Sequence, residues 1–524
     1  MRFSSLPAAR YSPAALFAGM WTCAVCVWVP LYLRNMYLDL VDAKFDLLAG
    51  FVGLGVIGLA AAFALRPRAF APGPGRLSAS ILFAPLLCLC YLIAWSMSDN
   101  RWTAMWGLNG RRAGLVLFVL CTALYLMVRL FCPGEAWPAL TVLLTAAGVF
   151  TAVLGWLNFW MLDPLGCYYC TLPGTGDLYL STLGNLNFFA GFMCLCFPSA
   201  LRCVFAARGP VSRGLAGAAC TAILSGLIIA NTDTAWVALG AMLALLCCDR
   251  RLTPAQLGLV SRMGAGVCAA ALATGLALAG GATSRVVLRT GSALLTRPPV
   301  ALAGLAVTLA VAAVCAARTF APWRLFRPLG IAAVALLAVG FALPSLFGVS
   351  LGPLNGAFWL KSGWGSSRWD VWGVLWQQYR ELPPLQKLFG VGADGVNALL
   401  NPRHTTTLIV LTGEVFDSAH NEYLQHLVCG GALGAACWVA FLVWHILQGM
   451  RARPFAALTL AGYGALALFS ITSPMLLPLC FVAAAFAAMP PVPPQKGAWA
   501  CFAPGLLLLF PALVLANQVE TLIL

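Results

Sequence analysis

The chain has 524 residues, of which 61% are hydrophobic and 9% charged, and its mean hydropathy of +0.90 is far above that of a soluble domain. This composition excludes a soluble globular enzyme and predicts a polytopic membrane protein. The formal net charge of +15 does not indicate nucleic-acid binding, because the Lys and Arg residues are scattered in short loops rather than clustered on one polar domain.

Apolar runs of about 17 to 25 residues recur along the chain, and each is long enough to cross a bilayer as an α-helix. They predict an all-α polytopic membrane protein with about 14 transmembrane helices, in a range of about 12 to 15. Short runs around Asn231 and Thr472 leave the count open, because they fit either hairpins or broken helices. The predicted spans are 13–33, 47–65, 79–97, 113–131, 138–158, 187–206, 214–231, 235–248, 263–282, 300–316, 329–348, 421–446, 455–471, 474–489 and 498–516.

The distribution of arginine predicts the orientation of these helices. Alternate loops carry two or three arginines each, which is typical of loops that stay in the cytoplasm. These loops lie at 66–76, 202–213, 250–262, 318–327 and 451–453. The remaining loops would face outwards from a plasma or inner membrane. The first apolar run follows two arginines and has no cleavage site after it, so we expect a retained helix.

The longest predicted outer loop divides the chain into three parts: N-terminal transmembrane helices over 1–348, a long extracytoplasmic loop over 349–420, and C-terminal transmembrane helices over 421–524. Within the loop, Ser367 to Asp370 has the spacing of a helix capping box. Aromatic residues then recur at helical offsets until Pro383: they are Trp369, Trp372, Trp376 and Tyr379. The pattern predicts an amphipathic helix at the membrane surface, where such stripes are more often interface anchors than substrate platforms.

Many of the 20 cysteines lie inside apolar runs, which is typical of small buried side chains rather than of a disulfide framework. Examples are Cys23, Cys26, Cys88, Cys90, Cys194, Cys196, Cys247 and Cys248. Cys167 and Cys170 differ, because they flank two tyrosines in a predicted outer loop. Their spacing fits a local disulfide or half of a metal site, and an unbonded pair fits nearly as well.

The sequence lacks the motifs of several enzyme and transporter classes. It has no G-x-x-x-x-G-K-[ST] phosphate-binding loop and no sizeable cytoplasmic domain, which disfavours ATP-driven transport. It also has no H-E-x-x-H zinc motif and no recognisable Ser or Cys nucleophile elbow.

The stretch DSAHNEYLQHL, residues 417–427, brings two of the four histidines to the start of an apolar run. Asp417 or Ser418 can cap the helix that follows. This would place His420 in the first turn, where the helix dipole disfavours a second proton. A neutral His420 can accept a proton from an attacking hydroxyl group. On residue type alone, a purely structural role in the loop is the favoured interpretation.

Arg368 is the second candidate, because a planar guanidinium binds phosphate oxygens in bidentate fashion and this residue begins the predicted surface helix. Its alternative role is a contact with lipid headgroups. Further cations in predicted outer loops run against the positive-inside trend, which modestly favours anion binding. They are Arg101, Arg111, Arg112, Arg285, Arg289 and Arg297.

Several motifs together resemble the O-antigen ligase and polymerase superfamily. The most specific are R-W-x-x-W, which starts at Arg368, and H-N-x-Y-L, which starts at His420 and is followed by glycines that enter a helix. Supporting motifs are G-L-N-G-R-R at 107–112, G-N-x-N-x-x-A at 184–190 and G-x-G-x-x-G at 390–395. We interpret the last as turns, because no βαβ unit surrounds it. The resemblance covers most of the chain in the order of its elements.

The resemblance implies a membrane glycosyltransferase that takes glycan from an undecaprenyl-pyrophosphate carrier on the outer face and joins it to a hydroxyl of an acceptor glycan, lipid or protein. It implies His420 as the base on the acceptor and Arg368 on the departing pyrophosphate, with the aromatic helix near the lipid carrier. Further substrate-binding candidates are Arg111, Arg112, Trp372, Asn421 and Tyr423.

Pyrophosphate is already a leaving group, so the resemblance implies no metal or other cofactor, and direct attack would invert the anomeric carbon. Other polysaccharide-assembly proteins would be further partners. Polymerisation of repeat units and ligation of a finished glycan both stay open.

The chain departs from the family pattern at one position. Where members carry a second arginine in a short outer turn, this sequence has Asp233, within NTDTAW. A carboxylate beside pyrophosphate would repel it. One expectation is that another arginine supplies the missing charge; the candidates are Arg111, Arg112, Arg285 and Arg289. The other expectation is that Asp233 binds the acceptor sugar.

Two other functions stay open. A flippase or secondary transporter for a lipid-linked or anionic substrate would need charged residues throughout its spans, whereas the candidates here gather on one face. A non-catalytic scaffold of polysaccharide assembly is kept open by Asp233. His426, about 240° around the helix from His420, should face elsewhere, and Gly430 and Gly434 should let a neighbouring helix approach.

Overall fold

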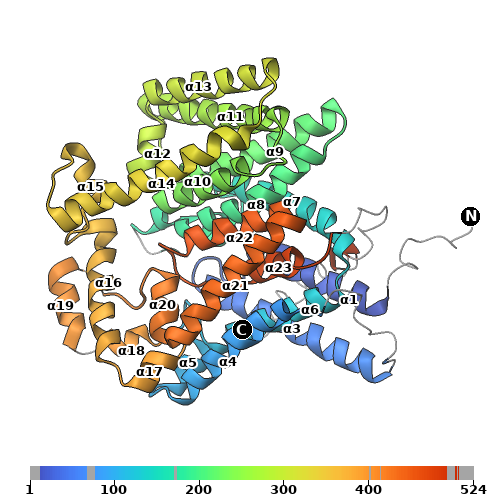
Figure 1. Ribbon diagram of the computed structural model, residues 1–524, viewed down its shortest axis with the longest axis vertical. Coiled ribbons are helices and arrows are strands. Elements are labelled where there is room, and N and C mark those ends of the chain that lie inside the picture. Colours follow the sequence, from blue (N-terminus) through green and yellow to red (C-terminus); the bar gives the residue numbers. More distant parts are fainter. Residues whose placement is uncertain are drawn as a thin grey trace, which may run out of the picture.

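The computed structural model describes residues 12–65, 67, 77–169, 171, 174–400, 403–413, 415–491, 502–503 and 505–506. Helices form most of this part of the chain, as Figure 1 shows, and the described strands make one short antiparallel pair. The all-α polytopic fold predicted from the sequence is therefore confirmed. The predicted span 498–516 lies almost entirely outside the described residues.

Ten helical segments in the described residues are long and apolar enough to cross a membrane. They are α1–η2–α2 (Pro13–Leu31), α3 (Leu40–Leu65), η4–α4 (Ala79–Ser96), η5–α7 (Gly134–Phe159), α8 (Leu186–Ala206), α9 (Pro210–Ile229), α11 (Pro254–Ala279), α13 (Pro298–Ala317), α14 (Pro322–Phe347) and α21 (Gly431–Ala452). Shorter apolar helices are α6 (Leu115–Phe131), α10 (Asp233–Cys247), α22 (Pro454–Leu466) and α23 (Leu477–Ala487). The predicted count of about 14 spans is not confirmed by length and composition.

The remaining elements connect these helices. They are α5 (Arg101–Trp106), η6 (Gly176–Leu178), β1 (Tyr179–Leu180), η7 (Ser181–Leu183), β2 (Gly184–Asn185), α12 (Thr290–Leu295), η8 (Gly352–Leu354), α15 (Asn355–Phe358), α16 (Trp364–Glu381), α17 (Pro384–Phe389), α18 (Val396–Leu400), α19 (Arg403–Thr412) and α20 (Glu422–Cys429). Strand β1 pairs antiparallel with β2, with Tyr179 opposite Asn185.

Two predicted spans differ from the observed helices for local reasons. The run predicted at 263–282 begins at Pro254, because the Thr253 side chain caps α11 and Gln256 completes a capping box. The run predicted at 421–446 is two helices, because Gly431 has a φ of 69° and its backbone packs directly on Leu388. A side chain at residue 431 would collide with that backbone, so α20 and α21 are separate elements.

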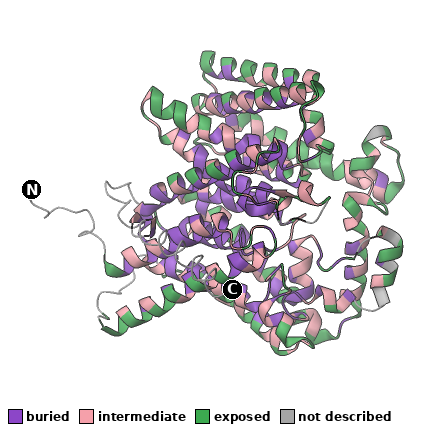
Figure 2. Ribbon diagram, turned by 180° about the vertical axis from the view of Figure 1, so that it is seen from behind, coloured by how far each residue is buried: buried purple, intermediate pink, exposed green. Residues whose placement is uncertain are grey.

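Burial separates a central bundle from a lipid-facing periphery. In the most apolar 18-residue stretch of α8, 83% of the residues are buried inside the protein. The corresponding shares are 17% in α13 and 6% in α14. In Figure 2 the buried residues gather in the middle of the molecule and the exposed ones cover the outlying helices. Since the exposed side chains of α14 beyond Arg324 are apolar, this part of the helix fits contact with lipid rather than with water.

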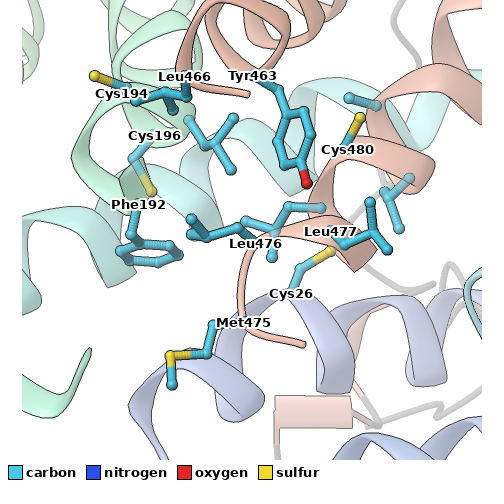
Figure 3. Close-up of a cluster of buried hydrophobic side chains, with 14 of the residues drawn as sticks. Cys26, Phe192, Cys194, Cys196, Tyr463, Leu466, Met475, Leu476, Leu477 and Cys480 are labelled. Atoms are coloured by element: carbon cyan, nitrogen blue, oxygen red, sulfur yellow. The ribbon is translucent and has the colours of Figure 1, made fainter. Parts of the chain in front are cut away.

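Most of the described cysteines lie in the apolar interior, as predicted, although Cys88, Cys247 and Cys248 are only partly buried. Cys26, Cys194, Cys196 and Cys480 are fully buried and unbonded, and Figure 3 shows them among Phe192, Leu466 and Leu476. Cys167 is also buried. Cys170 lies outside the described residues, so the pairing of these two cysteines stays a prediction.

Buried cationic side chains close two helix ends inside the bundle. Lys44 of α3 donates from Nζ to the carbonyls of Val29, Pro30 and Tyr32 at 3.2, 2.7 and 2.6 Å. Arg453 donates to four carbonyls, three of them after or near the end of α23: Phe486, Met489, Pro490 and Gly134. These contacts supply donors to carbonyl groups at or near helix ends, where intrahelical partners run out.

Candidate functional site

His420 lies in the short loop 415–421 that leads into α20. Its backbone is left-handed, with a φ of 46°, a conformation that most residues with a side chain avoid. Such strained positions persist where the surroundings hold them, and they gather at functional sites. The half-buried ring lies edge-on to Phe416 and makes no hydrogen bond to another described residue, so its nitrogens are available to a substrate.

The cap of α20 is Asn421, whose side-chain oxygen accepts a hydrogen bond from the Leu424 amide at 3.0 Å. The expectation that Asp417 or Ser418 caps this helix is therefore wrong. The extended backbone of Asn421 lets its short side chain reach back to the first turn. His420 consequently precedes the helix instead of lying in its first turn.

The protonation of His420 follows from burial rather than from the helix dipole. Burial, followed by the charge of Arg368, lowers the pKa of the imidazole from its usual 6.5 to about 4, although Asp417 opposes the shift. The ring is therefore neutral at pH 5 and above, as expected of a group that accepts a proton.

Arg111, near His420, is held by two carboxylates and one backbone carbonyl. Its side chain is 6% exposed, and Nη1 lies 3.1 Å from Oδ1 of Asp394 and donates to the Asp417 carbonyl at 2.9 Å. Nη2 pairs with the Asp417 carboxylate. Arg111 therefore ties the loop before α6 to the turn at 390–395 and to the loop that carries His420.

Asp394 completes this contact from the turn. Its carboxylate is fully buried, and Oδ2 accepts a hydrogen bond from the Leu108 amide at 2.7 Å. Burial raises the pKa of Asp394, while the charge of Arg111 opposes that rise. A buried carboxylate without this partner would be costly, so the two side chains depend on each other.

The adjacent Arg112 faces a different part of the molecule. Its Nε pairs with the carboxylate of Asp42 in α3, and its guanidinium lies 5.8 Å from the centre of the Phe45 ring. A left-handed backbone at Arg112, with a φ of 54°, separates the directions of the two neighbouring side chains. Only Arg111 of this pair contacts the loop that carries His420.

Arg368 lies near the start of α16. The backbone that leads into this helix does not form the predicted capping box. Gly365, Ser366 and Ser367 are left-handed, and the Asp370 carboxylate accepts a hydrogen bond from the Gly363 amide at 2.8 Å. The prediction that Ser367 caps the helix is therefore wrong. Arg368 donates from Nη1 to the Gly365 carbonyl, while its Nε is buried without a partner among the described residues.

The aromatic helix predicted after Arg368 is observed, and it ends at Glu381 before Pro383 and Pro384. Trp372 joins it to the site, because its indole N–H donates to the Ala419 carbonyl at 2.9 Å. Trp376 is 50% exposed. The helix therefore supports the residue before His420 with one tryptophan and leaves another at the surface.

Among the described residues, Asp233, which departs from the family pattern, and the nearby arginines contact other loops and helices rather than the loop that carries His420. Asp233 accepts hydrogen bonds from the Thr290 hydroxyl and the Gly291 amide at 2.8 and 3.1 Å, and so caps α12. Arg285 lies over the Tyr168 ring, 3.6 Å from its centre, and its Nε donates to the Asn158 carbonyl. These contacts give Asp233 and Arg285 local structural partners away from His420. Arg289 is exposed.

Two side chains that follow His420, the candidate Tyr423 and the unassigned His426, face the bundle. The Tyr423 hydroxyl donates to the Gly464 carbonyl of α22 at 2.8 Å. His426 is buried, bonded to the Tyr91 hydroxyl and stacked on Trp438, so it does face away from His420 as expected. Gly430 and Gly434 pack on Tyr91 and Cys90 of α4, which confirms the predicted close helix approach.

The turn at 390–395 supplies a site residue that the sequence did not single out. Gly390 and Gly392 have φ values of 87° and 106°, and Gly390 packs on the backbone of Cys429. The amides of Val391 and Gly392 donate to the carbonyls at the C-terminal end of α20 at 3.1 Å each. The glycines predict the turn but carry no signal for Asp394, whose partner is nearly 300 residues earlier in the chain.

Residues 286–439 match the model of a protein family described as O-Antigen ligase. The matched segment contains Arg368, the turn at 390–395 and His420, while Arg111 and Asp233 precede it. This match confirms the predicted resemblance to the O-antigen ligase family and supports a membrane enzyme that transfers glycan. A comparison with curated proteins gave no match.

Proposed function

We propose that this protein is an integral membrane glycosyltransferase that moves glycan from an undecaprenyl-pyrophosphate carrier to an acceptor hydroxyl, on the extracytoplasmic face of a plasma or inner membrane. One observation carries the proposal: a neutral His420 with ring nitrogens unpartnered among the described residues is held in a strained loop near the buried Arg111 and the half-buried Arg368. The O-antigen ligase match over 286–439 agrees with it.

The chemistry needs one proton acceptor and one group that stabilises a leaving anion. A ring nitrogen of His420 takes the proton of the acceptor hydroxyl as its oxygen forms the new bond to the anomeric carbon. The bond between that carbon and the pyrophosphate oxygen breaks at the same time. Attack from the face opposite the leaving group inverts the anomeric configuration.

Arg368 suits the leaving pyrophosphate. Its guanidinium is half-buried and keeps a free Nε–H, so it can donate to phosphate oxygens with little competition from water. After the transfer the proton of the acceptor hydroxyl is on His420, and the nearby charge of Arg368 favours its return to solvent. No protein-bound metal or other cofactor enters these steps.

Arg111 has a positioning role in this mechanism. Two carboxylates already occupy its guanidinium, which leaves it little capacity for a phosphate. Its contact with the Asp417 carbonyl instead fixes the loop three residues before His420. Asn421 positions His420 from the other side by starting α20.

The test compares cells of the native host that carry the wild type, His420→Ala or Tyr423→Phe at equal membrane levels. We expect His420→Ala to accumulate carrier-linked glycan and to lose mature surface polysaccharide, because a general base contributes about 10²- to 10⁴-fold in rate. Tyr423→Phe removes a hydroxyl bonded to Gly464 and should leave both pools near wild type.

Unchanged pools in His420→Ala would overturn the catalytic assignment and favour a scaffold. Carrier-linked glycan that stays on the cytoplasmic leaflet would favour a flippase. The chain length of the remaining product separates polymerisation from ligation.

A further inference from the structure

A cleft with an accessible volume of about 100 Å³ lies between the loop before α5, α17, the turn at 390–395 and α18. Its polar lining comes from Ser98, Asp99, Asn100, Thr103 and Gln386, and its apolar lining includes Val391, Ala398 and Leu399. Figure 1 places these elements together at the end of α16 that is farther from Arg368.

We infer that this cleft binds a sugar of the acceptor glycan, which rests on the proposed function. The side chains of Ser98, Asp99, Thr103 and Gln386 make no hydrogen bond or ion pair with another described residue. They present hydroxyl, carboxylate and amide groups that pair with sugar hydroxyls. The cleft has one carboxylate and no Lys or Arg in its lining, which disfavours pyrophosphate as the occupant.

The cleft is built by a close contact that requires glycine. A Cβ on Gly392 would lie 2.8 Å from the Ser98 hydroxyl and 2.9 Å from Ala104, and the φ of Gly392 is 106°. The absent side chain lets the turn approach the loop before α5. The turn and the loop before α5 are therefore held in contact beside Ser98 and Ala104, two residues of the cleft lining.

Asp394 and Arg111 join the cleft to the loop that carries His420. The turn itself bonds through the amides of Val391 and Gly392 to the carbonyls of Val428 and Cys429, at the end of α20 opposite His420. Asp394, between the cleft residues Val391 and Gly395, pairs with Arg111, which holds Asp417. A glycan in the cleft thus contacts the elements that fix the base.

Donor and acceptor would approach His420 from different sides. Arg368 lies about 20 Å along α16 from Glu381, taking about 1.5 Å per residue, and α17 follows directly. Trp372 contacts Ala419 from the α16 side, whereas Arg111 contacts Asp417 from the side of the cleft. The pyrophosphate is thereby assigned to Arg368 and the acceptor sugar to the cleft.

The test measures binding by the full-length protein in lipid nanodiscs. The probe is a set of oligosaccharides made by partial hydrolysis of the host's own surface polysaccharide, which carry no lipid carrier. Ala398→Trp fills the cleft and Asp99→Ala removes a hydrogen-bonding wall, whereas Leu385→Trp adds the same bulk at a 62% exposed position of α17 outside the lining.

We expect Ala398→Trp to weaken binding at least tenfold and Asp99→Ala to weaken it severalfold, with Leu385→Trp at the wild-type value. In transfer assays Ala398→Trp should raise the KM for acceptor and leave the KM for donor unchanged. The same binding should persist in His420→Ala, which separates recognition from chemistry.

Three results would overturn the cleft assignment: no binding of the probe to the wild type, wild-type binding in both cleft variants, or a rise in the KM for donor alone. Full transfer by His420→Ala would instead contradict the proposed function, whatever the binding result. The two failures are therefore distinct.

Discussion

The two sides of the loop that carries His420 are built differently. On one side, Arg111 and Asp394 form a buried ion pair, and close-packed glycines hold the turn against α20. On the other side, α16 contributes one indole hydrogen bond from Trp372, and Arg368 keeps an unpartnered Nε. On the first side the charged groups of Arg111 and Asp394 are paired with other residues of the protein. On the second side the Nε–H of Arg368 remains available to a ligand.

This difference shows that two arginines near the same histidine can have different roles, one in positioning and one in binding. Arg111 and Arg368 are both poorly exposed guanidinium groups near His420, yet only Arg111 meets carboxylates. Residue type does not separate their roles. The partners do, and substitutions at each should therefore fail in different ways.

The largest effect is expected from Arg111→Ala. It leaves Asp394 buried without a counterion, so we expect a loss of about 3–5 kcal/mol in unfolding free energy and a lower membrane level. Thermal unfolding of the purified protein measures it. Arg112→Ala, at the more exposed pair with Asp42, is the matched control and should cost about 0–1 kcal/mol.

Addition of Asp394→Asn to Arg111→Ala removes the orphaned charge and should recover part of the stability. If the double variant is no more stable than Arg111→Ala, the ion pair does not account for the loss.

Arg368→Ala should preserve stability and reduce transfer by about 10²- to 10³-fold, the cost of removing one donor from a developing anion. The measurement pairs unfolding temperature with the turnover of carrier-linked donor. Arg368→Lys should restore only part of the rate, because an ammonium cannot reproduce the planar fork. If Arg368→Ala is destabilised but keeps the wild-type turnover per folded molecule, the role of Arg368 is structural and not catalytic.

The pH dependence of transfer should report the buried state of His420. With a pKa of about 4, the imidazole stays mostly neutral at pH 5, whereas one with the ordinary pKa of about 6.5 would be only about 3% neutral. The acid limb of kcat/KM should therefore lie near pH 4 and activity should persist at pH 5. A limb between pH 6 and 7 would contradict the assigned environment.

The smallest effect is expected from Trp372→Phe. The change keeps an aromatic ring and removes the hydrogen bond to the Ala419 carbonyl, which is worth about 0.5–1.5 kcal/mol. Transfer should fall about two- to tenfold. Trp376→Phe, at a half-exposed position one turn later, is the control and should leave the rate unchanged.

The fold was predictable because hydropathy and helix periodicity are local properties of the sequence. The aromatic helix that ends before Pro383, the buried cysteines and the close approach at Gly430 all follow from such signals. Helix starts were less predictable. Asn421 and Asp417 are both good capping residues, and only the observed backbone angles decide between them.

The candidate site was predictable only in part, because its geometry depends on contacts between distant segments. His420 and Arg368 stand in motifs that resemble a family, but nothing local distinguishes Arg111 from Arg112. Their separation rests on a left-handed backbone and on partners in α3 and the turn at 390–395. Asp233 likewise acquires a structural role only through α12.

Lys44 bears on how the chain is made. Its amine satisfies the last carbonyls of the first membrane helix, including those of Val29 and Pro30, from a position near the start of the second. Unpaired carbonyl groups in lipid cost several kcal/mol each. The first helix is therefore incomplete as an isolated span, and the two helices should integrate into the bilayer during synthesis as a single hairpin.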